Sequence, residues 1–453
     1  RLAMIRSFKL SELEAQCGGQ RFGSDVMFDR VSIDSRDVNG ALFIAIKGER
    51  LDGHDYINDA IENACAAVVS ERSSMPGIAT FVVEDSVAAL GHAGAINRKA
   101  FDGSVIALTG SAGKTTTKNM IATLLAELAP VTATKANHNN EIGVPLTLLD
   151  ISSESKFAVI EIGARHIGDI GSLGRFVRPD IALVLNAGSA HLGEFGSYEN
   201  IVKTKGELYG CLKPGGVAVV NLDDVATEQW VSELSDCDVF SFSASGANAD
   251  LRAGEINCLP EGTHFELCYR GEKQAVYLPQ PGRHNVSNAV AACAVAVVVG
   301  MTLSEIAAGL AKAKTVSGRL KSLQLSNGAL VLDDSYNANP ASMKAALDVL
   351  VLQPGAHIAV LGEMAELGDA ALAMHLEVAE HAKNIGVNRL YCVGPYADEM
   401  EKKFGSGAMS YGNNATLATA LEKTLMGNET ILVKGSRSAQ MEGVVSYLEG
   451  VLR

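Results

Sequence analysis

The stretch Thr109-Gly110-Ser111-Ala112-Gly113-Lys114-Thr115-Thr116 decides the fold of this chain. An apolar run at 105–108 leads into it, and its two glycines let the backbone come close to a phosphate group. Lys114 supplies a cation, while Thr115 opens a helix with its hydroxyl placed for Mg²⁺ and with N-terminal amides that add positive field. A strand, this loop and a helix in succession predict a binding site for Mg-ATP.

The spacing of this loop differs from that of the common phosphate loop. Four residues usually separate the two glycines, whereas only Ser111 and Ala112 separate them here. A chance match is the alternative explanation, but the strand before the loop and the helix after it favour a functional loop. The helix is indicated by apolar residues at helical spacing before Pro130, namely Met120, Ile121, Leu124, Leu125 and Leu128.

The composition is typical of a globular protein. Hydrophobic residues make up 47% of the 453 residues, charged residues make up 20%, and the net charge is -14. Such a chain lacks the basic surface that nucleic acids and anionic membranes require, so we expect neither nucleic-acid binding nor membrane insertion. The eight cysteines form no C-x-x-C pair, which favours a reduced, cytoplasmic location. The longest apolar run, about 289–301, is too short to span a bilayer, and residues 1–20 predict no secretion signal.

Three segments of the chain predict three α/β domains, at 1–84, 85–314 and 315–453. Strand-like runs of the first domain fall at 42–46, 66–69 and 80–83, with a helical stretch at 56–64. The second domain opens with a helix near 87–98 and adds, beyond the strand of the loop, apolar runs at 157–162, 181–185 and 216–220. Continuous apolar runs separated by helices indicate a parallel sheet covered on both faces.

Later segments complete the second and third domains. From 251 to 278 the pattern changes to short alternating strands, which predict an antiparallel extension, and helices follow at about 284–299 and 303–313. Strands of the third domain are expected at 330–334, 358–362, 389–393, 408–411 and 430–433, alternating with helices. This pattern predicts a Rossmann-like doubly wound sheet, but no Gly-x-Gly-x-x-Gly fingerprint supports nicotinamide binding.

Candidate metal ligands follow the strands of the second domain. Glu161 falls in the apolar run at 157–162, where a carboxylate is costly to bury unless it is paired, and near the strand end where ligands gather. His191 follows the run at 181–185, although a lone histidine is usually structural and Mg²⁺ prefers oxygen ligands. By its spacing alone, Lys205 is most simply part of a solvated helix face.

Several polar residues allow both a structural and a ligand-binding interpretation. Asn139 lies in a polar, turn-like stretch, and Asn285 and Asn339 could each cap a helix that begins beside them. The paired acids Asp333 and Asp334 end a buried-looking strand, which is typical of ligand contact. Surface charge is the simplest interpretation of the cations Arg319, Lys434 and Arg437.

Taken in order, these segments resemble the Mur ligases, ATP-driven enzymes that extend the peptide of peptidoglycan precursors. The resemblance covers almost the whole chain, and residues 109–117 are similar to the shorter phosphate loop of that family, which accounts for the glycine spacing. Three further stretches resemble the member that adds D-alanyl-D-alanine to UDP-N-acetylmuramoyl-tripeptide: Asn139-Asn140-Glu141-Ile142-Gly143-Val144-Pro145, residues 333–340, and Leu361-Gly362-Glu363-Met364-Ala365-Glu366-Leu367-Gly368. The Asp-Asn-Pro-Arg motif of the sister ligase is absent.

The resemblance implies roles for individual residues. Contacts with ATP are implied for Thr109, Gly110, Ser111, Ala112, Gly113, Lys114, Thr115, Thr116, Asn285, Asn288, Arg319 and Asp334, with His284 on the nucleotide side. Contacts with the UDP-substrate are implied for Ser32, Asp34, Ser35, Arg36, Lys47 and Asn139, and contacts with the peptide for Lys434, Ser436 and Arg437. Catalysis is assigned to Lys114, Glu161, His191 and Lys205, and two Mg²⁺ sites to Thr115, Glu161, His191 and Lys205, the lysine as a carbamate.

The implied reaction is ATP-dependent amide-bond formation through an acyl phosphate, with release of ADP and phosphate, in peptidoglycan and cell-wall synthesis. The first domain would hold the UDP-sugar, the second ATP, and the third would close on ATP and bind the amino substrate in a monomeric enzyme. Either diaminopimelate or lysine fits as the third peptide residue. The alternatives are a related ligase such as folylpolyglutamate synthase, a phosphate-loop ATPase that acts as a motor or switch, and a non-catalytic nucleotide sensor.

Overall fold

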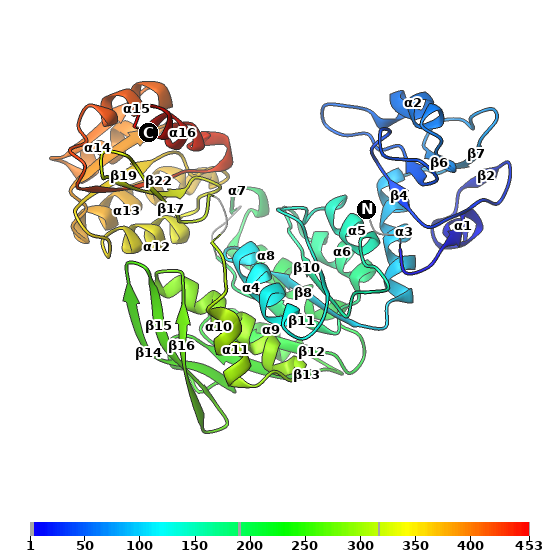
Figure 1. Ribbon diagram of the computed structural model, residues 1–453, viewed down its shortest axis with the longest axis horizontal. Helices are drawn as coiled ribbons and strands as arrows, with labels where there is room; N and C mark the ends of the chain where they lie inside the picture. Colours follow the sequence, from blue (N-terminus) through cyan, green and yellow to red (C-terminus); the bar gives the residue numbers. More distant parts are fainter. Residues whose placement is uncertain (1–3, 189–191, 316–317, 453) are drawn as a thin grey trace.

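The computed structural model describes residues 4–188, 192–315 and 318–452, and the chain forms three bodies that follow one another in sequence (Figure 1). The N-terminal and C-terminal bodies lie at opposite ends of the molecule, with the central body between them. Each body is built on its own main sheet, of five, nine and six strands in chain order. The α/β class expected from the sequence is confirmed. Within the described ranges, no helix combines the length and the apolar character needed to cross a bilayer.

The N-terminal body has a small sheet of order β2-β7-β6-β5-β4, parallel except for β2. Its strands are β2 (Gln20–Phe22), β4 (Val31–Ser32), β5 (Leu42–Ile44), β6 (Ala67–Ser70) and β7 (Ala79–Val82). The pair β1 (Phe8–Lys9) and β3 (Met27–Phe28), the helices α1 (Leu10–Cys17) and α2 (Ile57–Glu62), and the 3₁₀ turn η1 (Gly53–Tyr56) complete it. The expected strands correspond to β5, β6 and β7, whereas β2 and β4 are too short to leave a recognisable pattern.

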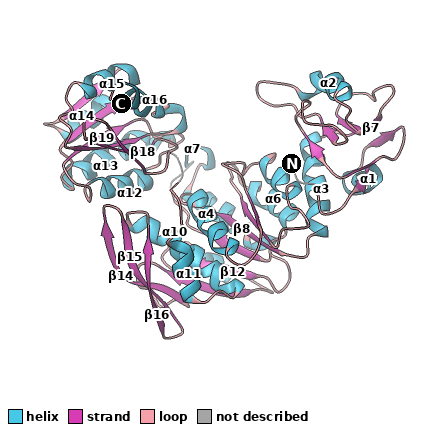
Figure 2. Cartoon of the chain, in the orientation of Figure 1, coloured by secondary structure: helices cyan, strands magenta, loops and turns pink. Residues whose placement is uncertain are grey.

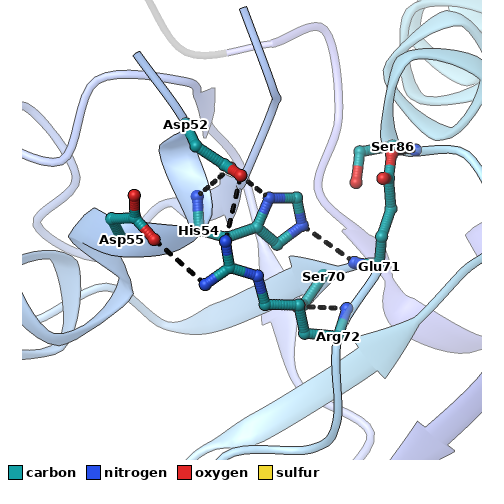
Figure 3. Close-up of polar contacts among 7 residues, drawn as sticks. All are labelled: Asp52, His54, Asp55, Ser70, Glu71, Arg72 and Ser86. Atoms are coloured by element: carbon teal, nitrogen blue, oxygen red, sulfur yellow. Dashed lines mark hydrogen bonds and ion pairs between the residues drawn. The ribbon is translucent and has the colours of Figure 1, made fainter.

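A polar network ties η1 to the end of β6 in this body (Figure 3). The backbone N–H of Glu71 donates to Nε2 of the buried His54, so Nδ1 carries the ring proton and donates to Asp52 at 2.6 Å. Arg72 joins Asp52 and Asp55, each at 3.0 Å. Since Asp52 also pairs with Lys47 in a β-bridge, the network fixes the base of the loop between them.

The central body carries a sheet of order β16-β15-β14-β13-β12-β11-β8-β10-β9. Its strands are β8 (Ser104–Thr109), β9 (Val131–Ala133), β10 (Phe157–Glu161), β11 (Ile181–Val184), β12 (Val217–Asn221), β13 (Asp238–Ser243), β14 (Leu251–Leu259), β15 (Gly262–Tyr269) and β16 (Glu272–Leu278). Its helices are α3 (Ser86–Ala100), α4 (Lys114–Ala126), α5 (Gly143–Leu149), α6 (Asp169–Val177), α7 (Leu192–Phe195), α8 (Tyr198–Gly206), α9 (Thr227–Ser232), α10 (Arg283–Val299) and α11 (Leu303–Leu310).

The central sheet is parallel up to β14 and antiparallel beyond it, as the sequence predicted. The strands β14, β15 and β16 extend away from the rest of the body (Figure 2). Two apolar cores cover the two faces of the parallel part, one built with α4, α10 and α11 and the other with α5, α6 and α8. Burial on both faces explains why these strands appear in the sequence as continuous apolar runs.

The C-terminal body has a sheet of order β17-β18-β22-β19-β20-β21 with only β17 antiparallel. Its strands are β17 (Lys321–Gln324), β18 (Leu330–Asp334), β19 (Ala356–Leu361), β20 (Arg389–Val393), β21 (Ala408–Tyr411) and β22 (Glu429–Lys434). Helices α12 (Pro340–Leu350), α13 (Ala371–Asn384) and α14 (Ala397–Phe404) help to bury one face, and α15 (Asn414–Glu422) and α16 (Glu442–Val451) the other. The doubly wound expectation is confirmed, with the exposed edge strand β17 added.

Helix α3 joins the N-terminal and central bodies, since its apolar residues belong to the N-terminal core while the helix also packs on α5, where Gly94 lies close to Pro145. Asn97 is the central polar contact of this joint. Its amide donates to the carbonyls of Leu148 and Ile151 at 2.8 and 2.9 Å, and its oxygen accepts from Ile5 N–H at 2.9 Å.

Replacing this amide should destabilise the joint. Asn97→Ala removes the partner of the Ile5 N–H and of the Ile151 carbonyl, while the Leu148 carbonyl keeps a bond from Ile151 N–H. A buried backbone group left without a partner costs roughly 1–3 kcal/mol. We expect the first thermal transition to fall by several degrees, whereas Asn248→Ala, at an exposed loop position, should leave it unchanged. Equal melting curves for the two variants would show that water replaces the lost bonds.

Candidate active site

The phosphate loop runs from the end of β8 into the first turn of α4. Gly113 caps that helix with a φ of 82°, in the left-handed region where a side chain is strained. A Cβ at this position would also clash with the side-chain oxygen of Asn288 from α10. Glycine is therefore required at 113 for two reasons, and Asn288 lies directly against the loop.

Residues after β11 hold the phosphate loop in shape. The side chain of Asn186 accepts from Ala112 N–H at 2.9 Å and donates to the Ala112 carbonyl at 3.2 Å. The hydroxyl of Ser111 accepts from Gly188 N–H at 2.9 Å. The backbone of the loop is thus fixed by protein contacts alone, which favours preorganised binding of an anion.

Lys114 lies over the loop that precedes it. Its ammonium donates to the Gly110 carbonyl at 2.7 Å. Burial lowers the pKa of Lys114, and the nearby carboxylate of Glu161 opposes that shift. A desolvated cation in this position would gain a strong, charge-assisted hydrogen bond from a phosphate oxygen.

Glu161, at the end of β10, shares the site with the loop. One carboxylate oxygen accepts from Asn139 Nδ2 at 2.7 Å and from the Thr115 hydroxyl at 3.3 Å. The other oxygen, Oε2, is buried and has no hydrogen-bond partner within the described ranges. A buried carboxylate oxygen left without a donor is suited to bind a cation, and Mg²⁺ commonly takes one or two carboxylates together with phosphate oxygens.

Lys118, which the sequence did not single out, supports this arrangement. Its buried ammonium donates to the carbonyls of Thr134 at 2.6 Å and Ala136 at 3.2 Å. These bonds hold the start of the segment that brings Asn139 to Glu161. The sequence did contain an indication of this role, because Lys118 is one helical turn after Lys114 and so falls on the same side of α4.

Lys205 on α8 is almost completely buried, with 2% exposure, so the solvated-face interpretation of this residue is wrong. Burial lowers its pKa to about 7, assisted by the charge of Lys114 and opposed by Asp169 and Glu207. The ammonium lies 5.7 Å from the centre of the Phe195 ring. A large fraction of Lys205 is therefore a neutral, nucleophilic amine at neutral pH.

The C-terminal body reaches the phosphate loop through Arg319. Its guanidinium donates to the Thr115 hydroxyl at 3.2 Å and stacks 4.7 Å from the centre of the Tyr336 ring. Gly318 has a φ of 70° and approaches Tyr336 closely, so the chain turns tightly just before the arginine. The cation expected from this body is thus directed at the loop.

Asp334 is engaged within its own body. Lys434 forms an ion pair with it at 2.7 Å, and Leu320 N–H donates to it at 3.2 Å. Burial raises the pKa of Asp334, and Lys434 opposes the rise. Lys434 also donates to the Asn337 carbonyl at 2.8 Å, so it braces the segment after β18 rather than standing as a surface charge. Asn339 caps α12, as the structural interpretation proposed.

The start of α10 faces the same site. Burial lowers the pKa of His284 to about 4, so its ring is neutral, and the charge of Lys434 adds to the shift. Asn285 donates to the Pro281 carbonyl at 2.9 Å, and Asn288 lies 3.5 Å from the Asn285 oxygen. Helix capping by the Asn285 side chain is not observed.

Most of these residues line a single cleft of about 1850 Å³, whereas the buried Lys118 and Lys205 do not. Residues from all three bodies contribute, including Glu49 from the loop that the network of Figure 3 holds at its base. The N-terminal residues expected to bind the UDP-substrate do not line this cleft, namely Ser32, Asp34, Ser35, Arg36 and Lys47. Arg36 of that body pairs with Asp34 at 2.8 Å. Asn139, the remaining residue expected to bind this substrate, lines the cleft beside Glu161.

The remaining expected ligand, His191, lies outside the described residues. Within those ranges no three His, Cys, Asp or Glu side chains gather into a metal-binding cluster. The donors that do fit Mg²⁺ are the unpartnered Glu161 oxygen and the Thr115 hydroxyl beside it.

Removing the charge of Glu161 should raise the Mg²⁺ requirement. Glu161→Gln retains an oxygen for Asn139 and Thr115 but replaces the unpartnered oxygen with an amide. We expect the Mg²⁺ concentration for half-maximal ATP turnover to rise about 10-fold or more, because loss of even a group that only supports a metal ligand typically costs about 10- to 100-fold in metal affinity. Glu154→Gln, at an exposed position of the same body, is the control. An unchanged Mg²⁺ titration would remove Glu161 from the metal site.

Comparison with known families gives three matches that together span most of the chain. They are the Mur ligase family catalytic domain at residues 28–101, the Mur ligase middle domain at 108–296, and the Mur ligase glutamate ligase domain at 318–437. The UDP-N-acetylmuramoyl-tripeptide–D-alanyl-D-alanine ligase of Escherichia coli K12 is 41% identical, with 98% of each chain covered.

Solved structures of MurF enzymes also match almost the whole chain. A crystal structure of MurF from Acinetobacter baumannii matches with a TM-score of 0.92 and 35% identity over 98% of this chain and 99% of the other. A structure of MurF ligase from Thermotoga maritima in complex with ADP matches with a TM-score of 0.85 and 31% identity, covering 93% of this chain and 97% of the other.

Proposed function

The chain belongs to the Mur ligase family, and on this basis we propose that it joins D-alanyl-D-alanine to UDP-N-acetylmuramoyl-tripeptide with the energy of ATP. The observation that carries the proposal is the cleft in which the phosphate loop and Glu161 meet Arg319 of another body. The reaction makes a precursor of peptidoglycan. Because ATP and UDP-linked precursors are cytoplasmic, we assign the reaction to the cytoplasm.

The chemistry explains why such a cleft is needed. A carboxylate does not condense with an amine in water, because oxide is a poor leaving group. The terminal carboxylate of the tripeptide therefore attacks the γ-phosphorus of ATP, ADP leaves, and an acyl phosphate forms. The amine of D-alanyl-D-alanine then attacks the acyl carbon, and the tetrahedral intermediate expels phosphate while the amine loses its proton.

The first step brings two anions together, so cations must surround them. Lys114 would bind the β- and γ-phosphates, and Arg319 would reach the same phosphates from the C-terminal body. Thr115 and Glu161 would hold Mg²⁺, which screens the phosphate charge when it is bound. His191 is assigned to a second magnesium site by the family resemblance.

We assign Lys205 the role of a carbamate. Its neutral amine would add to CO₂ and lose a proton, which gives an N-carboxylate in place of a cation. Burial favours this reaction, because it keeps the amine unprotonated near neutral pH. The resulting anion would support the second Mg²⁺ and reverse the charge beside Lys114.

The UDP-substrate would be held by the N-terminal body. Ser32, Asp34, Ser35, Arg36 and Lys47 are proposed to bind its nucleotide part at a distance from the central cleft, so that only the peptide enters it. Lys434, Ser436 and Arg437 would contact the peptide substrates. Asn139 would contact the UDP-substrate where it enters the cleft, because its side chain donates to Glu161 and its carbonyl accepts from Gly163 N–H.

Water must be excluded from the acyl phosphate, which we propose is achieved by closure of the C-terminal body. Arg319 already contacts Thr115, whereas Asp334 is held by Lys434. A carboxylate offers several acceptor positions, so Asp334 can keep Lys434 and still accept from the ATP ribose. X-ray scattering with an ATP analogue and the UDP-substrate should show compaction, and an unchanged radius of gyration would exclude this closure.

Phosphate release tests the function itself. We expect it to require ATP, UDP-N-acetylmuramoyl-tripeptide and D-alanyl-D-alanine together. Release with ATP alone would indicate a motor or switch, and binding without release would indicate a nucleotide sensor. Release with a folate acceptor in place of these substrates would indicate a folylpolyglutamate synthase.

A further inference from the structure

The segment Leu361-Gly362-Glu363-Met364-Ala365-Glu366-Leu367-Gly368 follows β19 of the C-terminal body and has no role in the reaction described above. Its end reaches the short helix α7 of the central body. The N–H of Gly193 in α7 donates to the Glu366 carbonyl at 2.9 Å. This is a backbone contact between two bodies, separate from the side-chain contact of Arg319 with Thr115.

The close approach of α7 to the turn at 366–368 depends on a glycine in each segment. A Cβ at Gly193 would lie 2.8 Å from the Gly368 nitrogen and 3.1 Å from the Glu366 carbonyl oxygen. A Cβ at Gly368 would lie 3.2 Å from the Gly193 Cα. Backbone atoms cannot move aside as a flexible side chain can, so any side chain at Gly193 must push the two bodies apart at this point.

The two glycines differ in what they need from their own body. Gly368 has a φ of 57°, and Glu366, two residues before it, has a φ of 64°. The turn therefore favours glycine at 368 whether or not the two bodies are in contact. Gly193 does not have a positive φ, and the three atoms nearest to its added Cβ all belong to the C-terminal body. Alanine at 193 should therefore disturb only the contact between the bodies.

Helix α7 also forms the wall beside Lys205. Phe195, at its end, is 4% exposed, and its ring centre lies 5.7 Å from the Lys205 ammonium. Asn200 of α8 donates to the Phe195 carbonyl at 2.7 Å, so α7 is tied to the helix that carries Lys205. A displacement of α7 would change the burial of Lys205.

We propose that Gly193 and Gly368 form a backbone latch through which the docked C-terminal body positions α7, and with it Phe195, against Lys205. Both glycines are positioning residues, and the proposal rests on the ligase function given above. The latch makes the site around Lys205 complete only when the C-terminal body is docked. It gives the 361–368 segment a role that differs from substrate contact.

Gly193→Ala tests the latch, with Gly210→Ala as the matched control. Gly210 lies in the same body, with open space around an added Cβ and no positive φ. We expect Gly193→Ala to lower kcat about 100-fold, as a displacement of about 1 Å at a site can. The KM for ATP and the melting temperature should stay near those of the Gly210→Ala protein.

Two measurements separate positioning from a general structural defect. In X-ray scattering with an ATP analogue and the UDP-substrate bound, the radius of gyration of Gly193→Ala should decrease less than that of the wild type. The CO₂ dependence of its activity should also change, because Lys205 would be less buried. A kcat within about 2-fold of the control, or a melting temperature that falls in parallel with kcat, would overturn the latch. Absence of ligation by the wild type would instead reject the function.

Discussion

Lys114→Ala should abolish ADP formation while UDP-substrate binding is retained. The ammonium of Lys114 lies over the phosphate loop and donates to the Gly110 carbonyl at 2.7 Å. Its charge would be most valuable when the carboxylate and the γ-phosphate approach one another, because the repulsion is then largest. Loss of one preorganised group of this kind lowers a rate by about 100- to 1,000-fold, and we expect at least the upper value here.

The control for this substitution is Lys156→Ala, which removes an exposed lysine from the same body. Single-turnover ADP formation and titration of the UDP-substrate should be measured on both proteins. Lys114→Ala should bind the UDP-substrate within about 3-fold of the control, since that substrate is assigned mainly to the N-terminal body. A parallel loss of binding and turnover would indicate misfolding rather than a role at the phosphates.

Lys205→Ala should be nearly inactive and should recover part of its activity when short carboxylates such as acetate or formate are added. The substitution leaves a space where the carbamate is proposed, and a small carboxylate can supply the missing anion. Lys203→Ala is the matched control, because Lys203 lies on the exposed face of the same helix. Full activity of Lys205→Ala, or inactivity with no response to carboxylates, would exclude the carbamate.

The pKa of Lys205 adds a pH dependence to this prediction. Burial lowers that pKa to about 7, and only the neutral amine adds CO₂. In protein freed of CO₂, the rate of reactivation at constant dissolved CO₂ should therefore rise as the pH increases through about 7 and level off above it. A rise centred near the usual lysine pKa of about 10.4 would show that Lys205 is exposed to solvent in the active state.

Local chemistry explains which parts of the site could be predicted from sequence. The phosphate loop was recognisable because its glycines, Lys114 and Thr115 are adjacent in the chain and flanked by a strand and a helix. Glu161 could be found because an acid in a buried apolar run needs a partner. Continuous apolar runs identified the central strands because helices cover both faces of that sheet.

Tertiary contacts explain what the sequence did not predict. The pairing of Asp334 with Lys434 joins two strands of one sheet that are distant in the chain, and no local pattern encodes it. The burial of Lys205 depends on Phe195 and the surrounding helices, so its charge pattern pointed to a solvated face instead. The contact between Gly193 and the 366–368 turn exists only when two bodies meet.

Short or exposed strands were also missed, for a different reason. β4 has two residues and β9 has three, which is too few for an alternating pattern. β17 lies at a sheet edge and is largely exposed, so it carries little apolar signal.

Transfer of oxygen from the peptide carboxylate to phosphate tests the central claim most directly. The terminal carboxylate of UDP-N-acetylmuramoyl-tripeptide would be labelled with ¹⁸O at both oxygens, and the released phosphate analysed by mass spectrometry. If the carboxylate attacks ATP and the amine then displaces phosphate, each phosphate carries one ¹⁸O and the new amide keeps the other. Phosphate without ¹⁸O, formed while both labels stay in the peptide, would contradict the acyl phosphate and indicate ATP hydrolysis by water.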